Sequence, residues 1–328
     1  MVRIVLAAYP GEDLDFAFRT YHGYLEATRR SIAASCPSRS SLLDGVAVAV
    51  KAGRWTTLTP RGATLPPRSA QYLRNAWGTE VLLNAPRVIG GADLISFANH
   101  WAVVQAYYAV FDALNALLVV GHPNPPRTHT TLLRWAANEV GSPRSPFVAP
   151  WTWRSSGPLN AYTYDGFPPG FTPDTRASTI ATVSDASAPH ILAKALKTTR
   201  DRKVDERRAD WLKGKKTKAG TKRKNLTRGE LLAHSAAMEP TTLFDLLYRL
   251  RIRSNYDDAD ALLSGALSST DAADFHAALC DIVGATLLTV EIYLSHRVGV
   301  YGLENALRPL AIPATLAPHS ATARQPLW

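Results

Sequence analysis

The sequence contains only two cysteines, Cys36 and Cys280, in 328 residues. So few thiols, placed so far apart, exclude a disulfide-stabilised scaffold and a zinc site built mainly on cysteine. They are typical of the reducing cytoplasm, which is the location we expect. The apolar stretch at residues 1–9 runs directly into Pro10 and acidic residues, so we expect no signal peptide.

The sequence also lacks the short motifs of the common nucleotide- and metal-dependent enzymes. It has no Walker A loop, no GxGxxG, no HExxH, no GxSxG and no clustered Cys/His spacing. His129 and His190 are isolated, and isolated histidines more often cap helices or pack in the core than bind a metal. We therefore expect no cofactor and no metal site.

Positive charge is concentrated in one segment. The formal net charge is +10 and the pI is about 9.7. Residues 194–228 hold 15 Lys or Arg against 4 Asp or Glu, whereas the rest of the chain holds 22 basic and 23 acidic residues. The basic segment is either a grip for nucleic-acid phosphates or a solvated linker, and the sequence leaves both open.

Helical periodicity dominates the pattern, so we expect a mainly α fold. The clearest helix is 93–120, where large apolar residues recur every three or four positions: Phe97, Trp101, Val104, Tyr108, Phe111 and Leu118. Polar residues interrupt this segment, which favours a buried helix over a membrane span. Further helices are expected at 13–34, 41–51, 128–140, 188–212, 239–253 and 271–296, with a short helical piece at 71–77.

Residues 141–173 break the helical pattern with seven prolines and seven aromatic residues. This segment is either an irregular loop whose aromatic rings fix it to the core or a platform on which single-stranded bases stack. The lysine-rich stretch at 213–224 is expected to be a mobile loop, because it contains two glycines. The Pro/Ala-rich segment 309–328 is expected to be loose.

Two segments carry motifs of a known kind. Residues 105–118 read QAYYAVFDALNALL, and residues 250–258 read LRIRSNYDD. The first resembles the aYYAvFhAlkALL helix of HEPN domains, which are helical bundles of toxin–antitoxin and antiviral systems. The second is similar to the LRxxADYd motif of one HEPN branch. Residues 129–133 and 271–296 fit a following helix start and the closing helix.

The resemblance implies an antiparallel helical bundle built from residues 91–140 and 238–308. The remaining parts would be an N-terminal helical extension (1–90), an insertion containing the aromatic loop and the basic arm (141–237), and the loose tail (309–328). HEPN ribonucleases are metal-independent homodimers that carry an Arg-x4–6-His motif. No histidine stands in that window after Arg251 or Arg253, and Asp112 stands where many relatives have histidine.

The candidate catalytic residues follow from the second motif: Arg251, Arg253, Asn255, Tyr256, Asp257 and Asp258. An arginine would hold a phosphate while an aspartate accepts a proton. The competing interpretation is a polar network that fixes the helix start. We expect Tyr107 and Tyr108 to be core or dimer-interface residues.

The expected function is that of a HEPN-like, nucleic-acid-associated protein, an RNA-targeting toxin or antiviral defence effector, with its catalytic competence left open. The expected partners are RNA or DNA, a second copy, and a cognate antitoxin or defence partner, with no membrane. The alternative is a non-catalytic module that dimerises and grips nucleic acid with seven basic residues: Lys213, Lys215, Lys216, Lys218, Lys222, Arg223 and Lys224. No motif supports a small-molecule-binding bundle.

Overall fold

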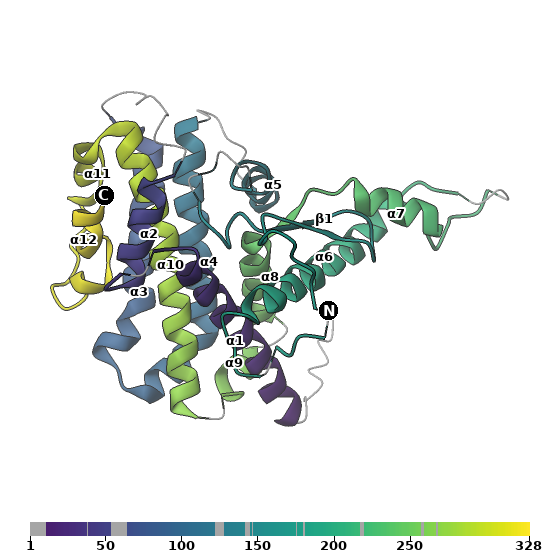
Figure 1. Cartoon of the computed structure of the whole chain (residues 1–328), viewed down its shortest axis with the longest axis horizontal. Coiled ribbons are helices and arrows are strands. Elements are labelled where there is room, and N and C mark those ends of the chain that lie inside the picture. The colour runs from purple at the N-terminus through teal and green to yellow at the C-terminus, as the bar shows by residue number, and fades with distance from the viewer. Residues whose placement is uncertain are drawn as a thin grey trace, which may run out of the picture.

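The computed structural model describes residues 11–37, 39–53, 64–121, 128–141, 145, 147–174, 176–179, 181–216, 220–256, 259–266 and 268–328. Over these residues the chain is mainly α-helical (Figure 1). The helices are α1 (Gly11–Ala34), α2 (Leu42–Lys51), α3 (Pro67–Ile89), α4 (Ala92–Gly121), α5 (His129–Glu139), α6 (Ala188–Leu212), α7 (Arg228–Ala236), α8 (Leu243–Tyr256), α9 (Ala259–Ser264), α10 (Ser269–Val298), α11 (Val300–Leu307) and α12 (Ala321–Arg324).

The centre of the molecule is formed by α3, α4 and α10, which run side by side (Figure 1). Almost every side chain of α10 after its first turns is buried, as its apolar composition predicts. Helix α3 packs along α4 over most of its length and contributes Trp77 to the same core. Helices α1, α2 and α8 cover the remaining sides, so residues before position 90 share the core of the bundle.

Several details of the helices differ from expectation. Helix α3 spans Pro67–Ile89, far more than the short piece expected at 71–77. Its polar and charged residues obscure the periodicity because α4 and α10 cover only part of its surface. Phe97 and Trp101 do not join the core: they are 68% and 52% exposed on the first turns of α4. Helix α10 begins at Ser269 with Ser268 as its cap, two residues before the expected start at residue 271.

The aromatic loop is fixed to the core, as one of the two interpretations predicted. Phe147, Trp151, Trp153 and Phe167 are buried, and Trp151 Nε1 donates to Thr286 Oγ1 at 3.1 Å. These four rings are therefore covered by protein and are not free to stack on bases. The loop also contributes to a small antiparallel sheet in the order β2-β1-β3, which periodicity did not predict: β1 (Arg154–Ser156), β2 (Thr163–Asp165) and β3 (Thr241–Thr242).

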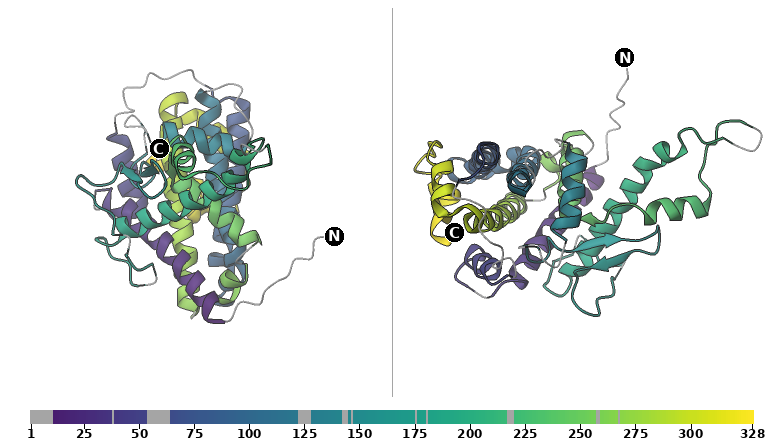
Figure 2. Two further views of the ribbon diagram at one scale, coloured as in Figure 1. Left: turned by 90° about the vertical axis from the view of Figure 1, so that its right-hand side faces the viewer. Right: turned by 90° about the horizontal axis from the view of Figure 1, so that it is seen from above.

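Helices α6 and α7 and the basic segment between them project from the body of the molecule (Figures 1 and 2). Helix α6 has the expected bounds, whereas α7 was not expected. A capping box between Thr227 and Glu230 starts α7. Lys216 and Lys222 face each other in an antiparallel bridge, so the described ends of the lysine-rich stretch form a hairpin-like arm.

Residues 309–328, expected to be loose, pack against α3 and α10 through a buried ion-pair network. Arg324 forms two hydrogen bonds with the carboxylate of Glu80 on α3 and two with Glu291 on α10. Both carboxylates and the guanidinium are almost fully buried. Trp77 and Trp328 also donate to Glu291. Composition alone could not reveal this anchor, because it depends on partners far away in sequence.

Helices α4 and α10 are also long and apolar enough to cross a membrane by length and composition. However, 72% of the most apolar stretch of α4 and 83% of that of α10 are buried inside this fold. The apolar surface of these helices is thus covered by other parts of the chain, as in the core helices of a helical bundle.

The buried network makes Arg324 a strong test of the fold. We expect Arg324→Met to lower the free energy of unfolding by about 3–5 kcal/mol, because it leaves two buried carboxylates without their cation. Urea denaturation followed by circular dichroism measures this. The control is Arg308→Met, an exposed arginine that directly precedes this segment. Equal midpoints for the two variants would contradict the assignment.

Candidate functional site

Helix α8 lies between α4 on one side and α6 on the other, and it also contacts α5. Arg251 and Arg253 are two positions apart, which places them on nearly opposite sides of a helix at roughly 100° per residue. Arg249 and Arg253 are four positions apart and share one side. The structure therefore divides the predicted arginine pair between two sites: Arg251 faces α4, and Arg253 lines a cavity against α6.

Arg251 is held against the tyrosine pair of α4. Its Nη2 donates to Tyr108 Oη at 2.9 Å, and its guanidinium carbon lies 5.4 Å from the centre of the Tyr108 ring. Its Nε is buried and has no hydrogen-bond partner among the described residues. A buried donor without a partner is destabilising, so this contact lowers the stability of the folded chain.

His129, the first residue of α5, lies beside the same tyrosines. Its Nδ1 is 2.7 Å from Tyr107 Oη, and its ring centre is 4.5 Å from Phe111 and 5.6 Å from Tyr248. The Thr128 side chain caps this helix by accepting from the backbone N–H of Thr131. We call the following group the His129 cluster: Tyr107, Tyr108, Phe111, His129, Tyr248 and Arg251.

The electrostatics of the His129 cluster favour a neutral imidazole. Burial lowers the pKa of His129 below 6.5, and the positive charge of Arg251 lowers it further. Burial raises the pKa of Tyr107 far above 10, so its hydroxyl keeps its proton. When His129 carries its proton on Nδ1, it donates to Tyr107 Oη and presents a lone pair at Nε2. That is the form a general base requires.

Asp112 is a second group of α4 with a shifted pKa. Burial raises the pKa of its carboxyl to about 6. It follows Tyr108 by four positions and so lies one helical turn further along the same face.

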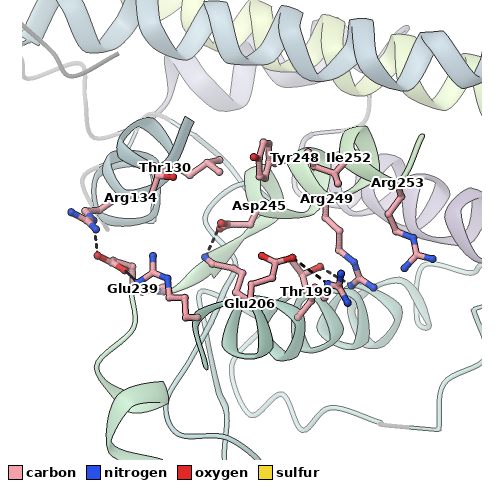
Figure 3. A pocket seen from close by; sticks show the side chains of 15 residues that line it. Thr130, Arg134, Thr199, Glu206, Glu239, Asp245, Tyr248, Arg249, Ile252 and Arg253 are labelled. Carbon is pink, nitrogen blue, oxygen red and sulfur yellow. Dashed lines mark hydrogen bonds and ion pairs between the residues drawn. The ribbon is translucent and has the colours of Figure 1, made fainter. Parts of the chain in front are cut away.

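A cavity of about 250 Å³ lies on the opposite side of α8, between α5 and α6. Figure 3 shows the residues that line it. Its wall combines six cationic side chains with three carboxylates: Arg134, Arg202, Lys203, Arg207, Arg249 and Arg253 with Glu206, Glu239 and Asp245. Tyr248 belongs both to this wall and to the His129 cluster, so one aromatic ring joins the two sites.

The other predicted catalytic residues are only partly described. Asn255 lies half-buried in the last turn of α8. Tyr256 ends that helix, but its side chain lies outside the described part of the structure, as do Asp257 and Asp258. The arrangement of an arginine beside Asp257 or Asp258 therefore stays a prediction.

The basic arm contains two kinds of cation. Lys215 and Arg223 bind the carboxylate of Glu230, with Lys215 Nζ at 3.0 Å and Arg223 Nη2 at 2.6 Å. The pKa of Glu230 lies well below its usual value, and its hydrogen bond with Arg223 is the largest cause. These two residues stabilise the arm itself. Four of the other predicted lysines are exposed, namely Lys213, Lys216, Lys222 and Lys224, and Lys218 lies outside the described residues.

Sequence reasoning missed the histidine of the site. It searched for a histidine shortly after Arg251 and classed His129 as an isolated cap or core residue. The structure brings both to one cluster through α4, whose Tyr107 and Tyr108 contact each of them. Tyr107 is buried as expected, but its hydroxyl is engaged with His129. The only signal in the sequence was the position of His129 at the helix start that resembles HEPN domains.

Removing the charge of Arg251 should move the titration of His129. We expect Arg251→Gln to raise the pKa of His129 toward 6.5, because a nearby positive charge disfavours protonation of the imidazole. Burial, the larger cause, persists, so the pKa stays below that of an exposed histidine. A pH titration of the His129 ring protons by NMR measures the change. An unchanged midpoint would contradict the coupling, and Arg208→Gln on the exposed surface of α6 is the control.

The described residues include no group of three His, Cys, Asp or Glu side chains placed to hold a metal ion. Comparison of the chain with protein-family models, with curated proteins and with solved structures found no significant match. The His129 cluster and the cavity behind it are thus the basis on which a function can be argued.

Proposed function

We propose that this protein binds RNA and cleaves it without a metal ion, with the His129 cluster as the reaction centre. The observation that carries the proposal is the juxtaposition of His129 and Arg251 around Tyr107 and Tyr108. A neutral imidazole beside a guanidinium offers a base and an oxyanion donor in one place. This is the pair of functions that the HEPN resemblance implies, supplied here by a histidine from another helix.

The proposed reaction uses the ribose itself as nucleophile. His129 Nε2 takes the proton of a 2′-hydroxyl, whose oxygen attacks the adjacent phosphorus while the bond from phosphorus to the 5′-oxygen breaks. The products are a 2′,3′-cyclic phosphate and a 5′-hydroxyl, which takes its proton from solvent. The Arg251 guanidinium donates to a non-bridging oxygen, whose negative charge grows as the bond forms.

The HEPN resemblance supports the remaining parts of the proposal. It implies a homodimer that acts in the cytoplasm as a toxin or antiviral effector, controlled by a cognate antitoxin or a defence partner. The exposed lysines of the basic arm supply attraction for phosphates that does not depend on base sequence.

Replacing His129 tests the chemistry. We expect His129→Ala to reduce cleavage of total RNA at least about 100-fold, because loss of a general base typically has an effect of this size. The assay follows RNA fragments by gel electrophoresis in the presence of EDTA, and a phosphatase-resistant 3′ end identifies the cyclic phosphate. His319→Ala, which alters an exposed histidine, is the control. Undiminished cleavage by His129→Ala would remove His129 from the mechanism.

A second candidate function is non-catalytic binding of nucleic acid through the basic arm. The observation that favours it is the exposure of Lys213, Lys216, Lys222 and Lys224 on a segment that projects from the body (Figure 2). Lys215 and Arg223 bind Glu230, so the test below uses the four lysines that form no ion pair among the described residues.

Neutralising the four exposed lysines tests the arm. We expect their joint replacement by Gln to weaken binding of single-stranded RNA and to reduce the salt dependence of the binding constant. Each lost phosphate contact should lower the slope of log K against log salt by about 0.7. Fluorescence anisotropy at several salt concentrations measures the slope. The control replaces the exposed residues Arg39, Arg176 and Arg308 by Gln. Equal slopes for the lysine variant and this control would show that the lysines of the arm do not bind the RNA phosphates.

A further inference from the structure

The cavity between α5, α6 and α8 contains a cation that its neighbours do not neutralise. Arg249 is half-buried, and its hydrogen bonds go to hydroxyls, at 3.2 Å from Thr198 Oγ1 and 3.4 Å from Thr199 Oγ1. Within the described part of the chain it forms no ion pair. Burial lowers the pKa of Arg249, and the like charges of Arg253 and Arg202 lower it further. A guanidinium in this setting destabilises the protein when no anion is present.

The carboxylates of the cavity are engaged elsewhere. Asp245 binds Lys203 Nζ at 2.7 Å and accepts from the backbone N–H of Thr242. Glu239 binds Arg134 at 2.6 Å on the far side of the cavity. Figure 3 shows these pairs apart from the Arg249 and Arg253 guanidiniums. Among the described residues, Glu206 pairs with Arg202, and both side chains are 62% exposed, so water screens that pair.

The remaining wall is apolar. It is formed by side chains from α5, α8 and the segment before β3, namely Leu133, Pro240, Tyr248 and Ile252. An occupant must therefore combine an anionic group at the Arg249 end with an apolar or aromatic body. Arg249 lies in the same wall as Arg202 and Arg253, whose charges act on it, and several guanidiniums favour a dianion over a single carboxylate charge. Guanidinium groups bind phosphate oxygens in pairs. The volume of about 250 Å³ admits a small molecule or one terminal residue of a polymer.

We propose that this cavity is a binding site for a phosphomonoester, with the phosphate on Arg249 and the apolar part against Tyr248 and Ile252. The phosphate is either that of a free phosphorylated small molecule or the 5′-phosphate of a nucleic acid. The site is separate from the RNA-cleaving centre proposed above, and it does not depend on cleavage. The two share only the Tyr248 ring, which lies between the cavity and His129.

Isothermal titration calorimetry on the full-length protein tests this site. The probe is phenyl phosphate, with benzoate and inorganic phosphate as comparisons. We expect phenyl phosphate to bind at least tenfold more tightly than benzoate, which has the ring but a single charge. It should also bind more tightly than inorganic phosphate, which lacks the apolar part. Equal affinity for benzoate, or no binding of phenyl phosphate, would overturn the proposal.

Substitution of Arg249 separates recognition from folding. We expect Arg249→Met to weaken phenyl phosphate binding at least tenfold while its melting temperature without ligand stays at or above that of the wild type, because an uncompensated cation is removed. Arg202→Gln, on the exposed rim, should weaken binding about two- to fivefold, as expected for an exposed charge. Arg208→Met, which lies on α6 outside the cavity, is the matched control. Undiminished binding by both Arg249→Met and Arg202→Gln would overturn the assignment.

A 5′-phosphorylated RNA distinguishes the two sources of phosphate. If this RNA binds more tightly than phenyl phosphate, and loses this advantage in Arg249→Met, the ligand is a nucleic-acid end. If the RNA binds less tightly than phenyl phosphate, while phenyl phosphate binding still depends on Arg249, the ligand is a free small molecule. The His129→Ala variant should bind phenyl phosphate as the wild type does, so failure of the cleavage proposal would leave this result unchanged.

Discussion

The placement of α6, which forms one wall of the cavity, depends on one buried arginine. Arg200 is fully buried and donates to the backbone carbonyls of Gly157, Ser235 and Glu239 at 2.8–2.9 Å. These carbonyls come from the turn after β1, the end of α7 and the segment before β3. A single guanidinium thereby ties together three parts of the chain that have few regular hydrogen bonds to one another. Because α6 carries Arg200, the same contacts fix α6 beside α8 and create the cavity between them.

Helix α8 then presents different chemistry on its two sides. Toward α4 it offers Arg251 to a cluster of tyrosines and a histidine, where burial keeps the imidazole neutral. Toward α6 it offers Arg249 to a cationic cavity with an apolar wall. The first site is suited to proton transfer beside a phosphate, and the second to holding an anion. Tyr248 lies between them, so both can act on one nucleic acid or separately.

The mainly helical fold could be predicted because its evidence is local. The apolar residues of the long helices recur with helical periodicity. Helix α6 was predicted with its observed bounds because prolines and glycines interrupt the sequence on both sides of it. Prediction failed where stability comes from distant partners. The tail was expected to be loose because Pro and Ala carry no pattern, yet the buried Arg324 anchors it to Glu80 and Glu291. Helix α3 was underestimated because its buried face is narrow.

The sequence by itself determined the helical class and the concentration of positive charge in α6 and in the segment that leads to α7. Only the tertiary structure decided what the arginines of α8 face. Residues two positions apart on a helix point in opposite directions, so Arg251 and Arg253 entered different sites. His129 and Arg251 come together because α4 packs between α5 and α8 and places its two tyrosines against both. Such a contact is set by the packing of whole helices, which no spacing along the chain records.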